Sequence, residues 1–278
     1  MVAPTHSQLI DADDRLATVF RHFYCVQQAP DAPAIQQKLL PHYEMMLAFN
    51  FGPPISFTVG NQEKRIEQVT ILGPLQKMLT YTLPPGTDLI VINFALNGFY
   101  RLLGLPIDQL STTTPDSVID ASRFEELWTQ LVETPPLSDR LEILTKYFLD
   151  CITPLNDETI TLLNSIPYFQ NSAIEPVKTL AQEQGISPRS LQLRLRTQFG
   201  YSAKEMTRFL RFKQVLMYLQ NTTNPADVDW LELVSRFGYY DHSHLSKDFT
   251  YYLNVTPRQF LQQLAHGNVC SSKPGRFY

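Results

Sequence analysis

The sequence predicts an α+β protein in which an antiparallel β-sandwich or barrel with flanking helices precedes an all-α domain. Short segments rich in β-branched and aromatic residues fill the first half of the 278-residue chain. Apolar residues at spacings of three to four, typical of amphipathic helices, dominate the second half. The charge divides in the same way, because residues 1–167 carry 10 Lys and Arg against 19 Asp and Glu, whereas residues 168–278 carry 13 against 8. The basic half predicts an anionic partner.

Five segments of the first half have the composition of strands. Gly and Pro turn signals separate them, and they recur about every ten residues, as in a sandwich or small barrel. Residues 15–27 fit either a further strand or a helix. The five expected strands are 44–51, 55–60, 68–73, 77–83 and 89–95.

The pattern becomes helical from about Gly98. Residues 123–133 are amphipathic, and a second helix follows whose apolar stripe packs either on its own domain or against a second copy of the chain. Prolines and a polar stretch indicate a boundary near 155–172. We therefore expect a β-rich sensing and dimerisation domain at 1–160 and a helical domain at 168–266. The apolar stripe consists of Leu137, Leu141, Leu144, Phe148 and Ile152.

An internal repeat organises the second half. When Leu191 is aligned with Leu245, the apolar residues of the surrounding segments also fall on apolar ones. In each copy a glycine, Gly185 or Gly238, ends a short helix just before the N-cap of a second helix. Helix, tight turn, helix is the pattern of a helix-turn-helix unit, whose second helix lies in a DNA major groove. The two predicted units span about 175–199 and 228–253.

The outward faces of the two second helices carry side chains that suit DNA. Arg and Gln bind guanine and adenine edges, whereas Leu193 can contact only a thymine methyl group. Cations and hydroxyls beside these helices suit phosphates, and residues 187–213 hold seven Lys and Arg but one acidic residue, Glu205. Arg194 and Lys204 belong to this phosphate set. The remaining candidate contacts are Ser187, Arg189, Ser190, Gln192, Leu193, Arg196, Arg208, Arg211, Lys213, Tyr240, His242, Ser243, Ser246 and Lys247.

Other classes of protein find little support. No segment approaches the roughly 20 apolar residues of a membrane span, and the first residues lack the pattern of a signal peptide, so we expect a cytoplasmic protein without a membrane partner. The histidines at 242 and 244 point apart on a helix, and Cys25, Cys151 and Cys270 have no metal-ligand spacing. We expect no metal and no cofactor.

No catalytic motif stands out, so the chain is not expected to be an enzyme. Two rival hypotheses remain. One is a β-domain enzyme with a helical appendage. The other is a Cys-based DNA alkyl-transfer protein, which would require a reactive thiol in an electropositive setting.

From about residue 172 to 264 the chain resembles the AraC/XylS transcription regulators. The stretch SPRSLQLRLRTQFGYSAKEMTRFLRFKQVLMYL (187–219) resembles the family's first recognition helix and the long helix that connects its two helix-turn-helix units. The stretch FGYYDHSHLSKDFTYYLNVTPRQF (237–260) resembles its second recognition helix and the Thr-Pro that begins the last helix. The chain departs from the family at Leu193, where a basic residue is common. By resemblance, the residues that face DNA are Arg189, Gln192, His242, Ser243, Ser246 and Lys247.

This resemblance implies a bacterial regulator that binds double-stranded promoter DNA as a homodimer and contacts RNA polymerase. The stretch PGTDLIVINFALNGFYRLLGLPIDQLS (85–111) resembles the cupin-like domain that precedes the DNA-binding domain in one branch of the family. Such a domain implies a small-molecule effector, dimerisation or both, and a regulator without ligand control stays an alternative. Six aromatic residues are either core or pocket-lining in this domain: Phe49, Phe51, Phe57, Tyr81, Phe94 and Tyr100.

Overall fold

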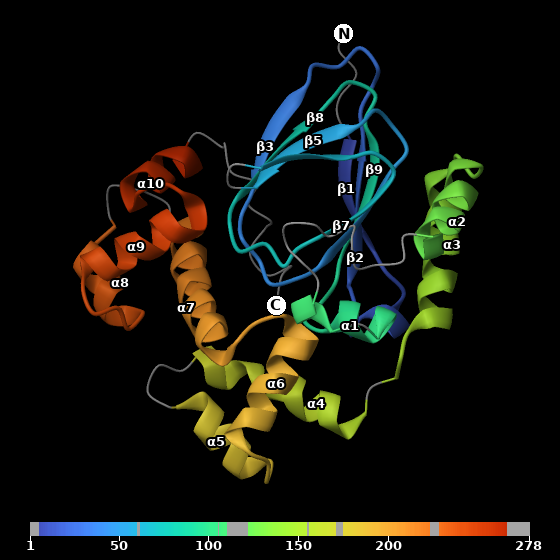
Figure 1. Ribbon diagram of the computed structural model, residues 1–278. Coiled ribbons are helices and arrows are strands. Elements are labelled where there is room, and N and C mark those ends of the chain that lie inside the picture. Colours follow the sequence, from blue (N-terminus) through green and yellow to red (C-terminus); the bar gives the residue numbers. More distant parts are fainter. Residues whose placement is uncertain are drawn as a thin grey trace.

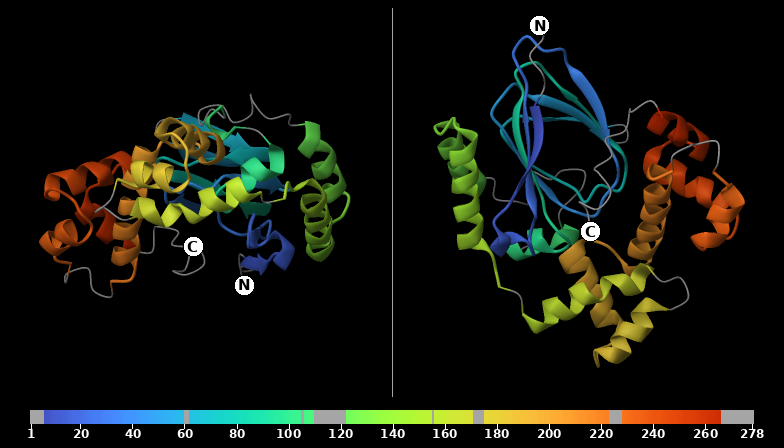
Figure 2. Two further views of the ribbon diagram at one scale, coloured as in Figure 1. Left: turned by 90° about the horizontal axis from the view of Figure 1, so that it is seen from below. Right: turned by 180° about the vertical axis from the view of Figure 1, so that it is seen from behind.

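The computed structural model describes residues 6–59, 62–104, 106–109, 122–154, 156–170, 175–222 and 228–265. A β-sandwich is flanked on one side by two helices and on the other by a helical domain (Figures 1 and 2). The predicted α+β class and its order along the chain are confirmed. Among the helices of the described ranges, none combines the length and apolar character that a bilayer crossing requires.

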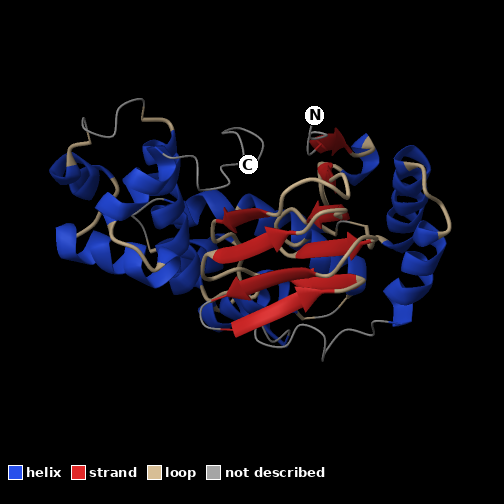
Figure 3. Ribbon diagram, turned by 90° about the horizontal axis from the view of Figure 1, so that it is seen from above, coloured by secondary structure: helices blue, strands red, loops and turns tan. Residues whose placement is uncertain are grey.

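The sandwich consists of two antiparallel sheets that face each other (Figure 3). The larger sheet has the order β1 (His6–Asp11), β2 (His22–Gln27), β9 (Asp88–Asn93), β4 (Met46–Asn50), β7 (Val69–Leu72). The smaller sheet has the order β3 (Ile35–Leu39), β8 (Leu79–Leu83), β5 (Ile55–Val59), β6 (Gln62–Ile66).

All five predicted strands form, with shorter bounds, but three further strands were not predicted from the sequence. These are β1, β3 and β6, whose sequences HSQLID, IQQKL and QEKRI are mostly polar. Each lies at the edge of its sheet, where solvent reaches one side of the strand and the alternation of apolar residues weakens. The ambiguous residues 15–27 divide into a short 3-10 helix, η1 (Asp14–Leu16), and strand β2.

Strand β4 is buried along its whole length because both faces of the larger sheet are covered. Met46 and Ala48 point between the two sheets, whereas Leu47 and Phe49 belong to a separate core beneath the helices. The covering helices are α1 (Gly98–Leu103), α2 (Ser122–Val132) and α3 (Leu137–Cys151).

The apolar stripe of α3 packs on its own domain. Leu144 and Phe148 are fully buried, and Phe148 makes edge-to-face contacts with Phe20 and Phe94. The remaining residues of the stripe, Leu137, Leu141 and Ile152, pack against the same core. Of the two interpretations of this stripe, the structure therefore supports internal packing rather than a seam between two copies.

A buried arginine holds α3 in place. Arg140 is only 4% exposed, and its Nη1 donates to Asp88 Oδ2 at 2.8 Å. Its Nε lies 2.8 Å from two carbonyls, that of Leu131 in the last turn of α2 and that of Thr134 just after this helix. The guanidinium also lies 3.9 Å from the centroid of the Phe51 ring. One side chain thus joins both helices to strand β9.

We expect Arg140→Ala to destabilise the β-domain by about 3 kcal/mol, because it removes the cation that pairs with Asp88 and the hydrogen bonds to two carbonyls. Urea unfolding monitored at the β-domain checks this value. Arg15→Ala is the matched control, since Arg15 also pairs with an aspartate, Asp13, at 2.7 Å, but on the surface. Equal stability losses in the two variants would contradict the role given to Arg140.

The helical domain contains two clusters of buried side chains on one continuous scaffold. The helices are α4 (Asp157–Asn164), α5 (Pro176–Glu183), α6 (Pro188–Phe199), α7 (Ala203–Gln220), α8 (Trp230–Arg236), α9 (His242–Leu253) and α10 (Pro257–Ala265), with the 3-10 helix η4 (Ile166–Gln170) after α4. Leu162 of α4 packs with Leu180 and Leu191, and Glu158 pairs with Arg194 at 3.0 Å. This packing places α4 with the helical domain, so we propose a boundary before Asp157 in place of the expected 160–168. The stretch 171–174 lies outside the described residues.

Candidate nucleic-acid interface and ligand cavity

The predicted repeat appears in the helix bounds. Helices α8, α9 and α10 follow α5, α6 and α7 at one constant interval along the chain, the same interval that aligns Leu191 with Leu245. The caps repeat as well, because Ser202 and Thr256 each accept a hydrogen bond from the backbone three residues on, at Glu205 and Gln259. Equivalent local sequences thus build both helix-turn-helix units.

The turns of the two units differ by one residue. In the first, Gly185 adopts a φ of +64°, Ile186 follows, and Ser187 caps α6 by accepting from Ser190 N at 3.1 Å. In the second, two residues separate Gly238 from the cap Asp241. The first of these, Tyr239, is buried as the core side chain of the turn, and the second, Tyr240, is 91% exposed. The extra residue therefore projects an aromatic ring into solvent beside α9.

Most of the predicted base-reading side chains are solvent-exposed. On α6 and its cap these are Ser187, Arg189, Ser190, Gln192, Leu193 and Arg196, and on the second unit they are Tyr240, His242, Ser243 and Lys247. Ser246 is half-buried, and its hydroxyl lies 3.3 Å from His242 Nδ1. Leu193 is 63% exposed.

Asp248 pairs with two of the predicted phosphate-contacting residues, Arg208 and Arg211. Its carboxylate is fully buried and accepts from Arg208 Nε at 2.8 Å and from the Tyr239 hydroxyl at 3.0 Å. Arg211 Nη2 lies 3.9 Å from the same carboxylate, and Arg211 Nη1 donates to Gly238 O. Helix α7 is thereby tied to the second recognition helix, α9. The side chains of Arg208 and Arg211 stay partly exposed to solvent, but their contacts with Asp248 restrict their movement.

A cationic cleft of about 840 Å³ lies between the two units. Gln192 of α6 and His244 of α9 stand at it, together with Arg208 and Arg211. Sequence reasoning missed Lys178 and Thr207, which also line the cleft with Lys204. Their spacing gives no signal, because Lys178 lies on α5 and Thr207 on α7, and only the folded helical domain brings them to one opening.

Lys213 lies on a different side of α7, facing the β-domain. Its Nζ is 3.8 Å from Glu44 Oε1, and His42 Nδ1 is 3.3 Å from Glu44 Oε2. Burial would raise the pKa of Glu44, but the Lys213 ammonium and the neighbouring His42 outweigh it and lower the pKa to about 2. An ionised carboxylate and a lysine thus meet across the domain boundary. A phosphate contact by Lys213 stays a prediction, and this geometry does not favour it.

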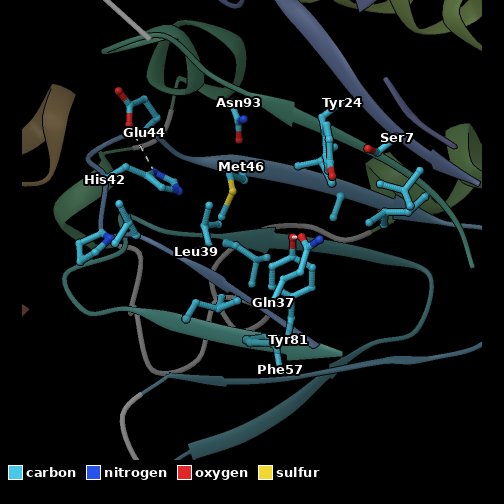
Figure 4. A pocket seen from close by; sticks show the side chains of 18 of the residues that line it. Ser7, Tyr24, Gln37, Leu39, His42, Glu44, Met46, Phe57, Tyr81 and Asn93 are labelled. Atoms are coloured by element: carbon cyan, nitrogen blue, oxygen red, sulfur yellow. Dashed lines mark hydrogen bonds and ion pairs between the residues drawn. The ribbon is translucent and has the colours of Figure 1, made fainter. Parts of the chain in front are cut away.

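This pair stands at one end of a cavity of about 550 Å³ between the two sheets and α7 (Figure 4). The walls are mostly apolar. Leu216, Met217 and Gln220 of α7 close one side, so the helix that joins the two helix-turn-helix units is also part of the cavity wall. Among the six aromatic candidates, Phe57 and Tyr81 line the cavity, whereas the other four lie in or against the core of the larger sheet.

Further contacts dock the helical domain on the sandwich. Asn97 Nδ2 donates to Gln198 Oε1 of α6 at 2.8 Å, and both residues are buried. The Tyr43 hydroxyl donates to Glu205 O at 2.8 Å, while its ring packs edge-to-face on Phe209. Met78 N donates to Tyr252 O at 2.8 Å. Each helix-turn-helix unit therefore has its own contact with the β-domain.

Two of the three cysteines, Cys25 and Cys151, lie within the described residues. Burial, and secondarily the charge of Asp88, raises the pKa of Cys25 to about 12, so its thiolate is disfavoured. Cys151 is half-buried at the end of α3. Cys270 lies outside the described residues. Within the described ranges, no group of three or more His, Cys, Asp or Glu residues is arranged to hold a metal ion.

Residues 180–263 match the family model of a helix-turn-helix domain. The C-terminal segment is a helix-turn-helix domain of the AraC type. The AraC-type match supports a DNA-binding transcription regulator and favours it over an enzyme. Residues 8–116 match a domain of unknown function (DUF6597). No curated protein matches the chain by sequence.

Several solved structures are similar to the chain. ToxT from Vibrio cholerae O395 is 12% identical over 94% of this chain and 97% of that one, with a TM-score of 0.42. Wild-type ToxT from Vibrio cholerae strain SCE256, with an unsaturated fatty acid bound, is 14% identical over 91% and 97%, with a TM-score of 0.40. The AraC-like transcriptional activator CuxR is 13% identical over 76% and 86%, with a TM-score of 0.25.

The Glu44 contact predicts a dependence of stability on pH. Because its pKa in the folded protein is depressed from 4.5 to about 2, ionised Glu44 stabilises the fold above about pH 4.5, and this stabilisation is lost as the pH falls toward 2. We expect Glu44→Gln to reduce the drop in thermal midpoint between pH 5 and pH 3. Differential scanning calorimetry at several pH values checks this. Glu63→Gln, at an exposed carboxylate, should retain the wild-type slope.

Proposed function

We propose that the chain is a sequence-specific DNA-binding transcription regulator in which α6 and α9 enter successive major-groove faces of B-DNA. The observation that carries this proposal is the pair of exposed recognition faces on either side of one cationic cleft. Successive faces of the groove lie about 34 Å apart, and two rigidly linked units suit such a spacing. The buried Asp248 contacts support it, since they fix α9 relative to α7.

The proposed roles follow from the chemistry of each side chain. Arg189 and Gln192 read base edges with paired hydrogen bonds, and Leu193 packs on a thymine methyl group. On α9, His242, Ser243 and Lys247 face the second groove with Ser246 beside them. Lys178 and Lys204 supply phosphate contacts from the rim of the cleft, and Arg196 supplies one from the exposed face of α6. An exposed leucine among cations is explained by an apolar partner in the groove.

We expect Arg189→Ala and Lys204→Ala to impair DNA binding in different ways. Arg189→Ala should remove roughly 1–3 kcal/mol of discrimination between the specific site and a site altered at one base pair. Lys204→Ala should weaken binding to all sequences and reduce the slope of log K against log salt by about 1. Fluorescence anisotropy with a site selected from random duplexes measures both quantities.

Arg65→Ala removes the same charge from the exposed face of β6 and serves as the control, so its DNA affinity should match that of the wild type. Equal losses on specific and random DNA for both interface variants would refute the proposed division of labour.

We also propose that a small apolar effector occupies the cavity and controls DNA binding. A ligand there touches Leu216 and Met217, and therefore the helix that sets the relation between α6 and α9. An occupant changes DNA affinity only to the extent that it binds one arrangement of the domains more tightly than another. The double contact of α7 with the cavity and with both units supports this route.

Filling the cavity should abolish effector binding. Val91 lines the cavity from β9, and Val91→Phe should remove most of the fluorescence rise seen when the uncharged apolar dye Nile red is added. Thr58→Phe adds the same bulk on β5, outside the cavity lining, and should leave the rise unchanged. Saturating dye should shift the DNA affinity of the wild type but not that of Val91→Phe. If the dye leaves the DNA affinity of the wild type and of both variants unchanged, a regulator without ligand control is favoured.

Homodimerisation and a contact with RNA polymerase stay predictions of the family resemblance. Since the apolar stripe of α3 is used internally, the proposed dimer must use another surface. Sedimentation equilibrium over a range of protein concentrations determines the oligomeric state.

A further inference from the structure

The cavity has a pronounced polar end. Met46 and Ala48 of β4 alternate on the face that lines it, with Glu44 two residues before the strand, and along β9 Leu89, Val91 and Asn93 do the same. Met46 and Asn93 are directly opposite each other in the register. Glu44, just before β4, and Asn93, at the end of β9, therefore both lie at the end of the sheet where α7 closes the cavity. The other residues of these two rows are apolar or small.

An unused hydrogen-bond acceptor stands at this end. Asn93 Oδ1 is buried and has no hydrogen-bond partner, and Figure 4 shows its oxygen pointing into the cavity above Met46. A buried acceptor without a donor costs free energy that a suitable ligand group regains. The Glu44 carboxylate beside it also only accepts hydrogen bonds. A ligand that complements both groups therefore carries a hydrogen-bond donor.

The charges at this end disfavour charged ligands of either sign. A carboxylate would approach ionised Glu44, and two carboxylates that share a buried site raise each other's free energy. An ammonium group would approach Lys213, which already neutralises Glu44 at 3.8 Å. A neutral hydroxyl can donate to Asn93 without either conflict.

We propose that the cavity binds an uncharged, mainly apolar molecule that carries a hydroxyl group. The hydroxyl donates to Asn93 Oδ1, and the hydrocarbon part lies between the sheets against Met46, Val91 and Leu216. This inference rests on the proposed effector role of the cavity and adds the chemical class of the effector. Asn93 is then the residue that determines specificity for the donor group.

Isothermal titration of the full chain with four probes that each carry a ten-carbon chain tests the proposal. At pH 7 decanol should bind at least about tenfold more tightly than decanoate, decylammonium or decyl methyl ether, because only decanol is both neutral and a donor. Asn93→Leu should erase the preference for decanol over the ether while both still bind. Glu44→Gln should tighten decanoate binding about tenfold, since it removes the like charge. Arg65→Ala should change none of these affinities.

Three results would overturn the proposal: decanoate or decylammonium binding as tightly as decanol, the ether binding as tightly as decanol, or no binding by any probe. The regulator function fails separately, through the DNA measurements with Arg189→Ala and Lys204→Ala. Effector control fails separately as well, if decanol binds with the expected preference but leaves DNA affinity unchanged.

Discussion

Helix α7 has to satisfy three neighbours at once, and the arrangement of the molecule depends on it. Its first turns bury Met206 and Leu210 in the core of the first helix-turn-helix unit, whereas Phe212 and Val215 belong to the core of the second. A further row, which includes Lys213 and Met217, faces the cavity of the β-domain. A helix with partners on most of its sides cannot rotate to suit one of them without disturbing the others. The two recognition helices and the cavity are therefore mechanically linked through a single element.

Much of the helical domain could be predicted from the sequence because its signals are local. Caps such as Ser187, Ser202 and Asp241 fix where helices begin, and the apolar spacing fixes which side is buried, so the repeat is reproduced in the helix bounds. The central strands were also predictable, because both faces of a strand such as β4 are apolar. The polar edge strands β1 and β3 lack that signal, since their stability comes from pairing with a neighbouring strand rather than from their own apolar pattern.

The charged residues show where local reasoning stops. Lys204 and Lys213 belong to the same basic stretch of the sequence, residues 187–213. In the structure, however, Lys204 is exposed at the cleft, whereas Lys213 contacts Glu44 of the β-domain. Which side of a helix becomes internal depends on what packs against it, and for α7 that partner lies in the first third of the sequence. The cavity is unpredictable for the same reason, because its lining combines both sheets and α7. The aromatic residues alone could not distinguish Phe57, which lines it, from Phe49, which is core.

The one-residue difference between the two turns makes the two halves of the candidate nucleic-acid interface unlike each other. Although the units are copies in sequence, the residue before the cap is the exposed Tyr240 in the second unit and the half-buried Ile186 in the first, and Lys247 takes the place of Leu193. A half-turn of the domain therefore does not superimpose one recognition surface on the other. A single chain on DNA would distinguish upstream from downstream, so its binding site would be an oriented sequence of two unlike parts rather than a palindrome.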